Sequence, residues 1–243
     1  MTDAAAYPIT PRNRVKRLHE RARYDRASVW AVLDAAVLAH VAWTLDGQPF
    51  CTPTLHWRDG DRLYWHGSAA SRMLRTQAEG LPVCLAVSHL DGLVLARTAF
   101  HHSVNYRSAM CFGRARLVDD AEEKARALDG LVERLHPGRA ARLRPTTAQE
   151  LKATSVVAME IEEASVKVRA AGVADDAEDL SWPVWAGVVP LVTRVGAAEP
   201  CPHGTVPAPE PAELAIWREG RRLDDTLRET QDLWRPGAPP LAD

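Results

Sequence analysis

The sequence contains none of the short motifs that mark several large enzyme classes. It has no G-x-G-x-x-G, no P-loop, no H-E-x-x-H and no G-x-S-x-G, which argues against dinucleotide folds, P-loop enzymes, zinc proteases and α/β-hydrolases. No evident nucleophile stands beside a base. Any chemistry would therefore have to come from a bound cofactor, with the protein supplying orientation and electrostatics.

Paired cysteines are also lacking. Cys51, Cys84, Cys111 and Cys201 form no C-x-x-C pair, so we expect no structural zinc and no other metal site. The first three fall in expected strands and are interpreted as buried small hydrophobic residues in a reducing compartment.

Long apolar runs and an excess of one charge are missing too. No run approaches the roughly 20 apolar residues that span a bilayer, and the N-terminus lacks the apolar stretch of a signal peptide. The formal net charge is −2, so no overall positive field favours nucleic acid or a membrane surface. These absences predict a cytoplasmic protein that binds neither nucleic acid nor membrane.

What the chain does have is a series of short strands separated by tight turns. A helix is expected over 26–36, and strands over 37–44, 51–57, 63–66, 82–88, 93–98 and 109–118. The turns between them fall at Asp46-Gly47, Asp59-Gly60 and Asp91-Gly92. Six short antiparallel strands suit a closed barrel, because closure removes exposed sheet edges.

The second half adds helices to this β framework. Asp119-Asp120 begins a helix that His136-Pro137-Gly138 ends, and Thr146 and Thr147 begin a shorter one. Further strands are expected over 156–161 and 165–170, and one amphipathic helix is expected over about 211–234. We expect this helix to dock on the dimer of its own chain. The alternative is that it binds a different partner protein. The predicted class is mainly β with helices (α+β).

We expect four parts along the chain. They are a basic N-terminal arm (1–26), a barrel domain (27–196), a Pro-rich linker (197–211) and a C-terminal amphipathic helix with its tail (212–243). The arm is interpreted as solvated. The alternative is that some of its arginines reach a partner subunit or a cofactor phosphate.

Residues 63–75 suit an anionic phosphate. A period-2 run gives way at His66-Gly67-Ser68 to a helix expected over 69–79, and a helix N-terminus offers unpaired N–H groups to an anion. Ser68 and Ser71 can add hydroxyl donors, and Arg72 can add a planar fork of charged donors. Gly67 lets the backbone approach the anion closely.

A second stretch, 102–120, places polar residues at the start of a strand. Asn105, Tyr106, Arg107 and Ser108 open it, and Gly113 interrupts it. A glycine in mid-strand indicates a bulge or a close approach by a ligand or another chain.

The segments HGSAASR, SVNYRSAMCFGRA and WAGVVPL resemble the pyridoxamine 5'-phosphate oxidase-like, FMN-binding split-barrel family, in particular its nitroimidazole-resistance branch. The resemblance runs from about residue 10 to 196. It implies a six-stranded antiparallel split barrel, a homodimer, and a flavin mononucleotide in each of two clefts between the subunits. Met73 stands where the pyridoxamine oxidases carry a second basic residue, although Arg75 can compensate.

The resemblance also implies a set of cofactor-binding residues. Ser71 and Arg72 would hold the phosphate, and Arg107 and Ser108 would come from the interface strand. The full expected set is Thr52, His66, Gly67, Ser68, Ser71, Arg72, Asn105, Tyr106, Arg107, Ser108, Lys167 and Trp185.

Two kinds of residue near this site have open roles. His66 is the catalytic candidate, because a neutral imidazole can position a substrate or shuttle a proton to reduced flavin; the alternative is a turn histidine that satisfies backbone groups. Trp182 and Trp185 would lie near the flavin rim or the dimer seam, or pack in the core. Lys167 and Arg169 share one strand face and point at one anion or at solvent.

The leading hypothesis is an FMN-dependent oxidoreductase of flavin reductase or nitroreductase type, acting on a small substrate with NAD(P)H as a candidate electron donor. A second hypothesis is a haem-binding split-barrel protein, with iron held by His66, His101 or His102. A third is a non-catalytic flavin-binding or regulatory protein that contacts a partner through its C-terminal helix.

Overall fold

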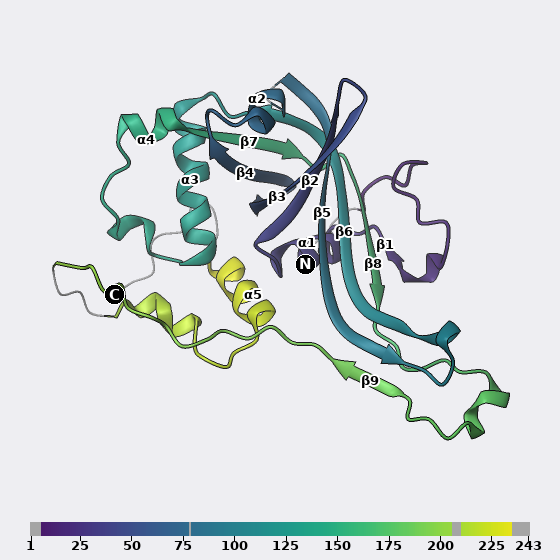
Figure 1. Cartoon of the computed structure of the whole chain (residues 1–243). Helices are drawn as coiled ribbons and strands as arrows, with labels where there is room; N and C mark the ends of the chain where they lie inside the picture. Colours follow the sequence, from purple (N-terminus) through teal and green to yellow (C-terminus); the bar gives the residue numbers. More distant parts are fainter. Residues whose placement is uncertain (1–5, 78, 206–209, 235–243) are drawn as a thin grey trace.

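A computed structural model describes residues 6–77, 79–205 and 210–234. Figure 1 shows a curved antiparallel sheet with helices gathered at one end and a long extension at the other. The strands are β1 (Ala22–Arg23), β2 (Leu38–Leu45), β3 (Gln48–Asp59), β4 (Arg62–Ser68), β5 (Glu79–Leu95), β6 (Ser103–Leu117), β7 (Thr154–Glu160), β8 (Glu163–Arg169) and β9 (Gly187–Pro190).

Five α-helices and five short 3-10 helices lie within the described residues. The α-helices are α1 (Arg26–Asp34), α2 (Arg72–Gln77), α3 (Ala121–Leu135), α4 (Ala148–Ala153) and α5 (Leu223–Leu233). The 3-10 helices are η1 (His19–Arg21), η2 (Ala99–His101), η3 (Ala140–Arg142), η4 (Ala177–Ser181) and η5 (Ala212–Ile216). None of these helices is both long and apolar enough to cross a membrane.

Six strands close into a ring, which confirms the predicted split barrel. The sheet order is β1-β8-β6-β7-β4-β3-β2-β5-β9, and an additional pairing of β5 with β6 closes the ring. The sixth barrel strand is β7. Of the segment 93–98, which was expected to fill that place, residues 93–95 are instead the outer end of β5 and residues 96–98 lie beyond that strand.

The predicted turn at Asp91-Gly92 is wrong, because β5 continues through it. The register with β6 shifts between Leu90 and Gly92 and then resumes with Gly92 opposite Asn105. A register shift of this kind is a bulge, which bends a strand without reversing it. Since β5 and β6 stay paired beyond the barrel, they form the long extension, and η2 lies at its tip (Figure 1).

Gly113 marks a close approach of two strands, as the sequence indicated. A Cβ at this position would lie 2.2 Å from the carbonyl oxygen of Glu160 and 2.7 Å from Cγ of Met159. No side chain fits at such distances, so only glycine lets β6 cross the end of β7 here. The approaching group belongs to the same chain.

The barrel interior holds the main core. Alternate residues of the strands point inward, and Val41, Leu63, Trp65, Leu85 and Met159 are almost completely buried there. A second apolar group lies outside the barrel, where the β3-β4-β7 wall meets α3. We call it the outer-face cluster; it consists of Trp57, Tyr64, Val118, Ala127, Val156 and Ala158.

Local signals in the sequence set several boundaries as expected. Asp46 and Gly47 both have positive φ, 50° and 75°, as a two-residue hairpin of the Asp-Gly type requires. Asp120 caps α3 by accepting the amide N–H of Glu123, and Thr147 with Glu150 forms a capping box on α4.

Two helix predictions need correction. The helix expected over 69–79 begins only at Arg72 and ends at Gln77, because the amide of Ser71 donates to the carbonyl of Ser68 in a turn. The single helix expected over 211–234 is two helices, η5 and α5, separated by a turn in which Gly220 has φ 78°. The helix α5 packs against α1 and α3 of its own chain.

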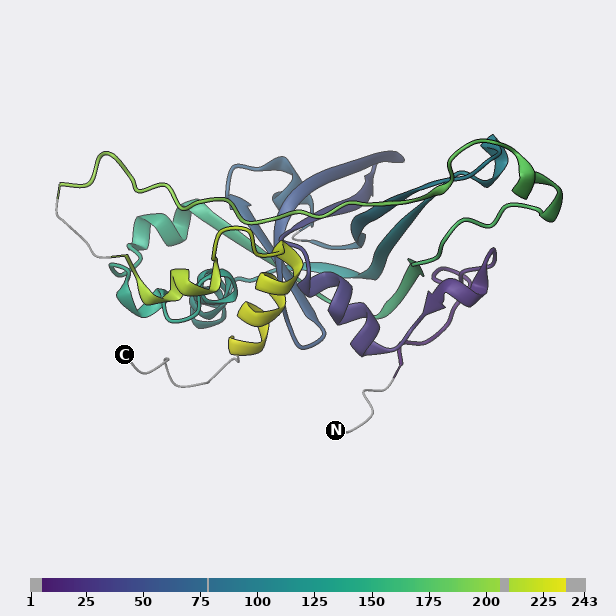
Figure 2. The ribbon, with the colours of Figure 1, turned by 90° about the horizontal axis from the view of Figure 1, so that it is seen from below.

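The described part of the N-terminal arm lies against the barrel, so its interpretation as fully solvated is wrong. Tyr7 is buried and donates its hydroxyl to Asp61, and Arg12 pairs with Glu163 at 2.7 Å. Figure 2 shows this arm folded back beneath the sheet. The division of the chain into arm, barrel, linker and tail stays a prediction, and the linker residues 206–209 lie outside the described residues.

All four cysteines are free thiols. Their expected burial holds in full only for Cys111, because Cys51 is exposed and Cys84 is intermediate. Cys51 lies on β3 with its neighbour Pro53 also exposed, so its side of the strand faces away from the barrel interior.

Candidate functional site

His66 lies near the end of β4, on the outer surface of the barrel wall. It pairs with Val156 of β7, and its ring meets Trp57 edge-on with centroids 5.8 Å apart. Because side chains directly opposite in an antiparallel pair share a face, His66 stands at the border of the outer-face cluster.

The His66 imidazole is half-buried, and one of its ring nitrogens makes no hydrogen bond within the described part of the chain. Burial lowers its pKa below the ordinary value, since a charged ring is poorly solvated there. Its Nδ1 is buried and has no hydrogen-bond partner among the described residues. Nδ1 of His66 therefore does not support the alternative of a turn histidine that satisfies backbone groups. This nitrogen could instead accept a proton or bind a metal ion.

The surroundings of His66 are largely apolar and aromatic. Trp57 stacks on Tyr64 with ring centroids 5.6 Å apart, and Leu128, Leu131 and Trp234 pack against the same outer-face cluster from α3 and the end of α5. Because the members of this cluster are themselves buried against α3, His66 stands at the edge of an apolar layer that the chain already fills.

The turn after β4 uses its polar groups partly on itself. The Ser68 hydroxyl accepts the amide of Ala70 at 3.2 Å, and a Cβ on Gly67 would lie 3.0 Å from the side chain of Leu74. Ser71 is the residue before α2 and is half-buried. Gly67 therefore allows Leu74 to pack closely against the turn. The Ser71 hydroxyl makes no hydrogen bond with the described residues.

Arg72 and Arg75 supply uncompensated positive charge at this turn. Both are exposed, and within the described residues neither pairs with a carboxylate. The Arg72 guanidinium lies 5.0 Å from the ring centroid of Phe50. Thr52 is two residues beyond Phe50 on β3 and therefore shares its face. Arg72 therefore lies beside the strand that carries Thr52, and a phosphate site shared by these residues stays a prediction.

The polar residues of β6 are held by their own chain. Arg107 forms two hydrogen bonds with Asp91, at 2.7 and 2.9 Å, and these bonds raise the Arg107 pKa. The side-chain oxygen of Asn105 accepts from Arg169 at 2.6 Å. Asn105 and Arg107 therefore stabilise the extension through hydrogen bonds within their own chain.

Ser108 and Lys167 are neighbours, and Tyr106 lies on the same side of β6 as Ser108. Ser108 is opposite Lys167 in the β6–β8 register and donates weakly to its carbonyl at 3.5 Å. Arg169 is buried and binds the carbonyls of Ala171 and Gly172. The expectation that Lys167 and Arg169 both serve one anion or one solvent face is therefore wrong for Arg169.

Trp185 lies far from His66 in a single chain. It precedes β9 on the extension, whereas β4 lies at the helical end of the barrel (Figure 1). Trp182 and Trp185 are 64% and 65% exposed, so the alternative of core packing is wrong within one chain. The structure does not bring the 66–72 turn, the 105–108 strand and Trp185 together in one protomer.

A polar hollow of about 270 Å³ adjoins Arg107. Its charged residues form one network, in which Arg107 lies 3.5 Å from Asp224 and Arg222 lies 3.0 Å from the same carboxylate. Arg222 and Arg107 lower the Asp224 pKa. Sequence reasoning missed Arg222 and Asp224, because Arg107 and Asp224 are 117 positions apart. It placed Asp91 in a turn and so missed its pairing with Arg107, although the two are only 16 positions apart.

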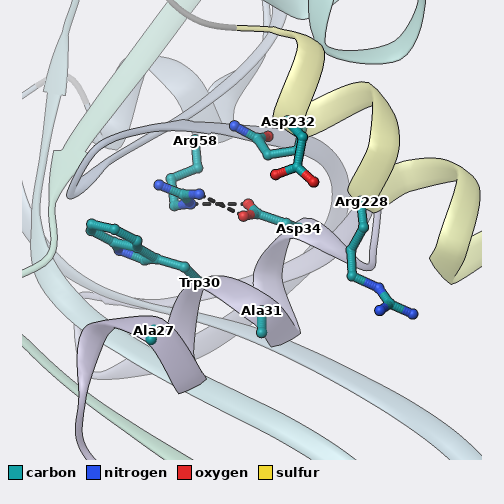
Figure 3. Close-up of a pocket in the computed structure, with 8 residues that line it drawn as sticks. Ala27, Trp30, Ala31, Asp34, Arg58, Arg228 and Asp232 are labelled. Atoms are coloured by element: carbon teal, nitrogen blue, oxygen red, sulfur yellow. Dashed lines mark hydrogen bonds and ion pairs between the residues drawn. The ribbon is translucent and has the colours of Figure 1, made fainter. Parts of the chain in front are cut away.

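A second hollow of about 360 Å³ lies between α1 and α5. Figure 3 shows Arg58 inside it, between the carboxylate of Asp34 and the ring of Trp30. Arg58 donates to Asp34 at 2.9 and 2.5 Å and also to the carbonyl of Gly60. Since these bonds use the guanidinium, the charged centre of this hollow is internally compensated.

The fold is a six-stranded split barrel closed by the pairing of β5 with β6. On its outside, His66 borders the outer-face cluster, and Arg72 and Arg75 are exposed at the turn after β4. The pyridoxamine 5'-phosphate oxidase family profile matches residues 25–168. The chain belongs to this family.

Two solved structures resemble the chain over most of its length. The flavocytochrome Anf3 from Azotobacter vinelandii is 46% identical with a TM-score of 0.81, and the match covers 87% of this chain and 98% of Anf3. The FAD and heme binding protein from Mycobacterium smegmatis is 38% identical with a TM-score of 0.78, over 84% of this chain and 98% of that protein. No curated protein matches the chain.

Proposed function

We propose that this protein is a flavin-dependent oxidoreductase that also binds haem, with His66 as the iron ligand. The observation that carries the proposal is the neutral His66 ring at the border of an apolar wall, with a buried nitrogen that has no partner. The two extensively similar structures, a flavocytochrome and an FAD and heme binding protein, support this pair of cofactors.

The donor chemistry at His66 fits haem iron. A neutral imidazole nitrogen is a common axial ligand, and lowering of the His66 pKa by burial keeps that form at pH 7. The ring of Trp57 meets the His66 ring edge-on, so it would be an apolar neighbour of a haem held there. The other histidines weighed from the sequence fit less well, because His101 contacts Asp176 and His102 contacts the carbonyl of Thr98.

The rim at Arg72 fits the phosphate of a flavin nucleotide. Arg72 and Arg75 are exposed cations without a carboxylate partner in the described residues, and Ser71 adds a hydroxyl beside them. This chemistry serves the phosphate of FMN, which the family resemblance implies, and equally the first phosphate of FAD. We propose FMN as the bound form, and mass spectrometry of the released flavin distinguishes the two.

A homodimer would complete the flavin site. The extension exposes many large apolar side chains, namely Leu90, Phe100, Met110, Leu180, Trp182, Val184 and Trp185, more than isolated surface residues require. A second copy can cover them and bring its own 105–108 strand and Trp185 to the Arg72 rim. This arrangement would unite groups that one chain keeps apart.

When bound, flavin exchanges hydride or single electrons and haem exchanges single electrons. The protein's part is to hold the two groups and to exclude water around them. If His66 binds iron, it is a ligand and not the catalytic proton shuttle that the sequence also allowed. Residence in the cytoplasm, a small substrate and NAD(P)H as electron donor stay predictions.

The test is the absorption spectrum of the purified protein and of His66→Ala. We expect a Soret band together with flavin bands, and loss of the Soret band alone in the variant. His136→Ala is the matched control, because His136 also has a buried Nδ1 without a partner and a pKa lowered by burial. A Soret band that survives in His66→Ala contradicts the haem assignment.

The flavin half is tested separately. Arg72→Ala should weaken flavin binding by about tenfold or more, since one charge-assisted phosphate contact contributes about 1.5–3 kcal/mol. Arg144→Ala, at an exposed arginine paired with Glu150, should leave it unchanged. A protein that binds neither FMN nor FAD, before or after reconstitution, contradicts the proposed oxidoreductase.

A further inference from the structure

The tip of the extension gathers three metal-ligating side chains. They are His101 from η2 and Asp176 and Asp179 from the start of η4, and their ligating atoms all lie within 4.8 Å of one another. Nε2 of His101 is 3.2 Å from Oδ2 of Asp176. Figures 1 and 2 both show the tip of the β5–β6 extension beside the green segment that precedes β9.

The spacing of these atoms suits a divalent transition-metal ion. Ligands about 2.0–2.2 Å from a zinc ion lie about 3–3.5 Å apart in tetrahedral or octahedral geometry. The His101–Asp176 distance is already in that range, and the Asp179 carboxylate lies within 4.8 Å of both ligating atoms. One imidazole and two carboxylates also match the ligand preferences of zinc, manganese and iron(II).

A separate contact holds the two segments in place. Asp175 accepts from the backbone amide of Arg97 at 3.0 Å and from its guanidinium at 2.9 Å, and its side chain is completely buried. Because Asp175 is the neighbour of Asp176, this contact fixes Asp176 beside His101. The ring of His101 is in turn packed edge-on against Phe100. These contacts therefore place His101 and Asp176 beside each other before any ion arrives.

The charges at the tip also favour a cation. Arg97 is compensated by Asp175, so its charge is not available to the neighbouring carboxylates. Within the described part of the chain, no lysine or arginine pairs with Asp176 or Asp179, and His101 is their one potential cationic neighbour. Two carboxylates this close repel each other, and a bound divalent ion would remove that repulsion.

We propose that His101, Asp176 and Asp179 form a binding site for a divalent transition-metal ion such as Zn²⁺. The ion would tie the tip of the β5–β6 extension to the turn that carries Trp182, whose amide donates to the Asp179 carbonyl at 2.9 Å. It would thereby fix the exposed tryptophans of the extension in position. This site is distinct from His66 and does not depend on either proposed cofactor.

The test is calorimetric titration of ZnCl₂ into the full-length protein, with its own cofactors, after treatment with a chelator. We expect one ion per chain, with binding weakened on the order of 100-fold in His101→Gln and in Asp179→Asn. His102→Gln is the matched control, because this adjacent histidine binds the Thr98 carbonyl instead. It should bind Zn²⁺ like the unmodified protein.

A thermal melt provides the second measurement. Zn²⁺ should raise the melting temperature of the unmodified protein and of His102→Gln, and should not raise that of Asp179→Asn. Asp179 is an informative position, because its carboxylate makes no hydrogen bond or ion pair among the described residues and its replacement should leave folding intact. Absence of binding in the unmodified protein, or equal binding in all variants, overturns the proposal.

Discussion

His56 should make the stability of the protein depend on pH. This histidine of β3 is buried, and its Nδ1 has no hydrogen-bond partner in the described part of the chain. Burial, together with the nearby positive charges of Arg134 and Arg58, lowers the His56 pKa from 6.5 to about 4. The Arg134 pKa is itself lowered by burial, to about 10, so this arginine is still charged at pH 7 and opposes a second charge.

The sign of the effect follows from the direction of the shift. In the unfolded chain His56 takes up a proton near pH 6.5, whereas the folded protein resists protonation until about pH 4. The contribution of a neutral buried His56 is therefore complete above pH 6.5 and is lost as the pH falls towards 4. A difference of about 2.5 pKa units corresponds to about 3 kcal/mol, of which about 2 kcal/mol is lost between pH 7.5 and 5.

The assay is urea unfolding of the unmodified protein and of His56→Gln at both pH values. Glutamine cannot titrate, so the variant should lose about 2 kcal/mol less unfolding free energy over this interval. The two proteins keep all carboxylates and the other histidines in common, and therefore the difference between them isolates His56. Equal pH dependence in both proteins would refute the reasoning.

Two further predictions concern packing and buried charge. Gly113→Ala should lower the unfolding free energy by about 1–3 kcal/mol, because its Cβ would overlap the Glu160 carbonyl. Gly172 has open space around it, so Gly172→Ala should change the unfolding free energy by less than about 0.5 kcal/mol. Equal melting temperatures of the two variants would contradict this account. Asp34→Asn should cost about 3 kcal/mol, because it leaves the nearly buried Arg58 without its carboxylate partner. As a control, Glu122→Gln removes an exposed ion pair and should cost under about 1 kcal/mol in the same denaturant titration.

The candidate site shows where sequence reasoning stops. The HGSAASR segment identified His66 and Arg72, because residue type and spacing along a turn are local properties. The partners of Arg107 were not predictable in the same way. Asp224 comes from α5 and lies 117 positions away, and no local pattern encodes such a contact.

The metal-ligating residues at the tip of the extension illustrate the same limit. His101 and Asp176 are 75 residues apart, and neither lies in a motif with ligand spacing. Because adjacent residues of a strand point to opposite faces, the sequence indicated only that at most one of His101 and His102 belongs to a given binding site. The pairing of β5 with β6, and the Arg97–Asp175 contact, decide which one.

The sequence by itself determined the hairpin at Asp46-Gly47, the starts of α3 and α4, the class of barrel and the family. The hairpin and the helix starts depend on backbone conformations and hydrogen bonds between residues a few positions apart, whereas the class of barrel and the family followed from the strand pattern and from three segments that resemble a known family. Tertiary structure alone decided that β7 completes the ring, that β5 continues through Asp91-Gly92, and that His56 stays neutral. Those outcomes depend on which distant strands pair and on how deeply a side chain is buried, and both are properties of the closed barrel as a whole.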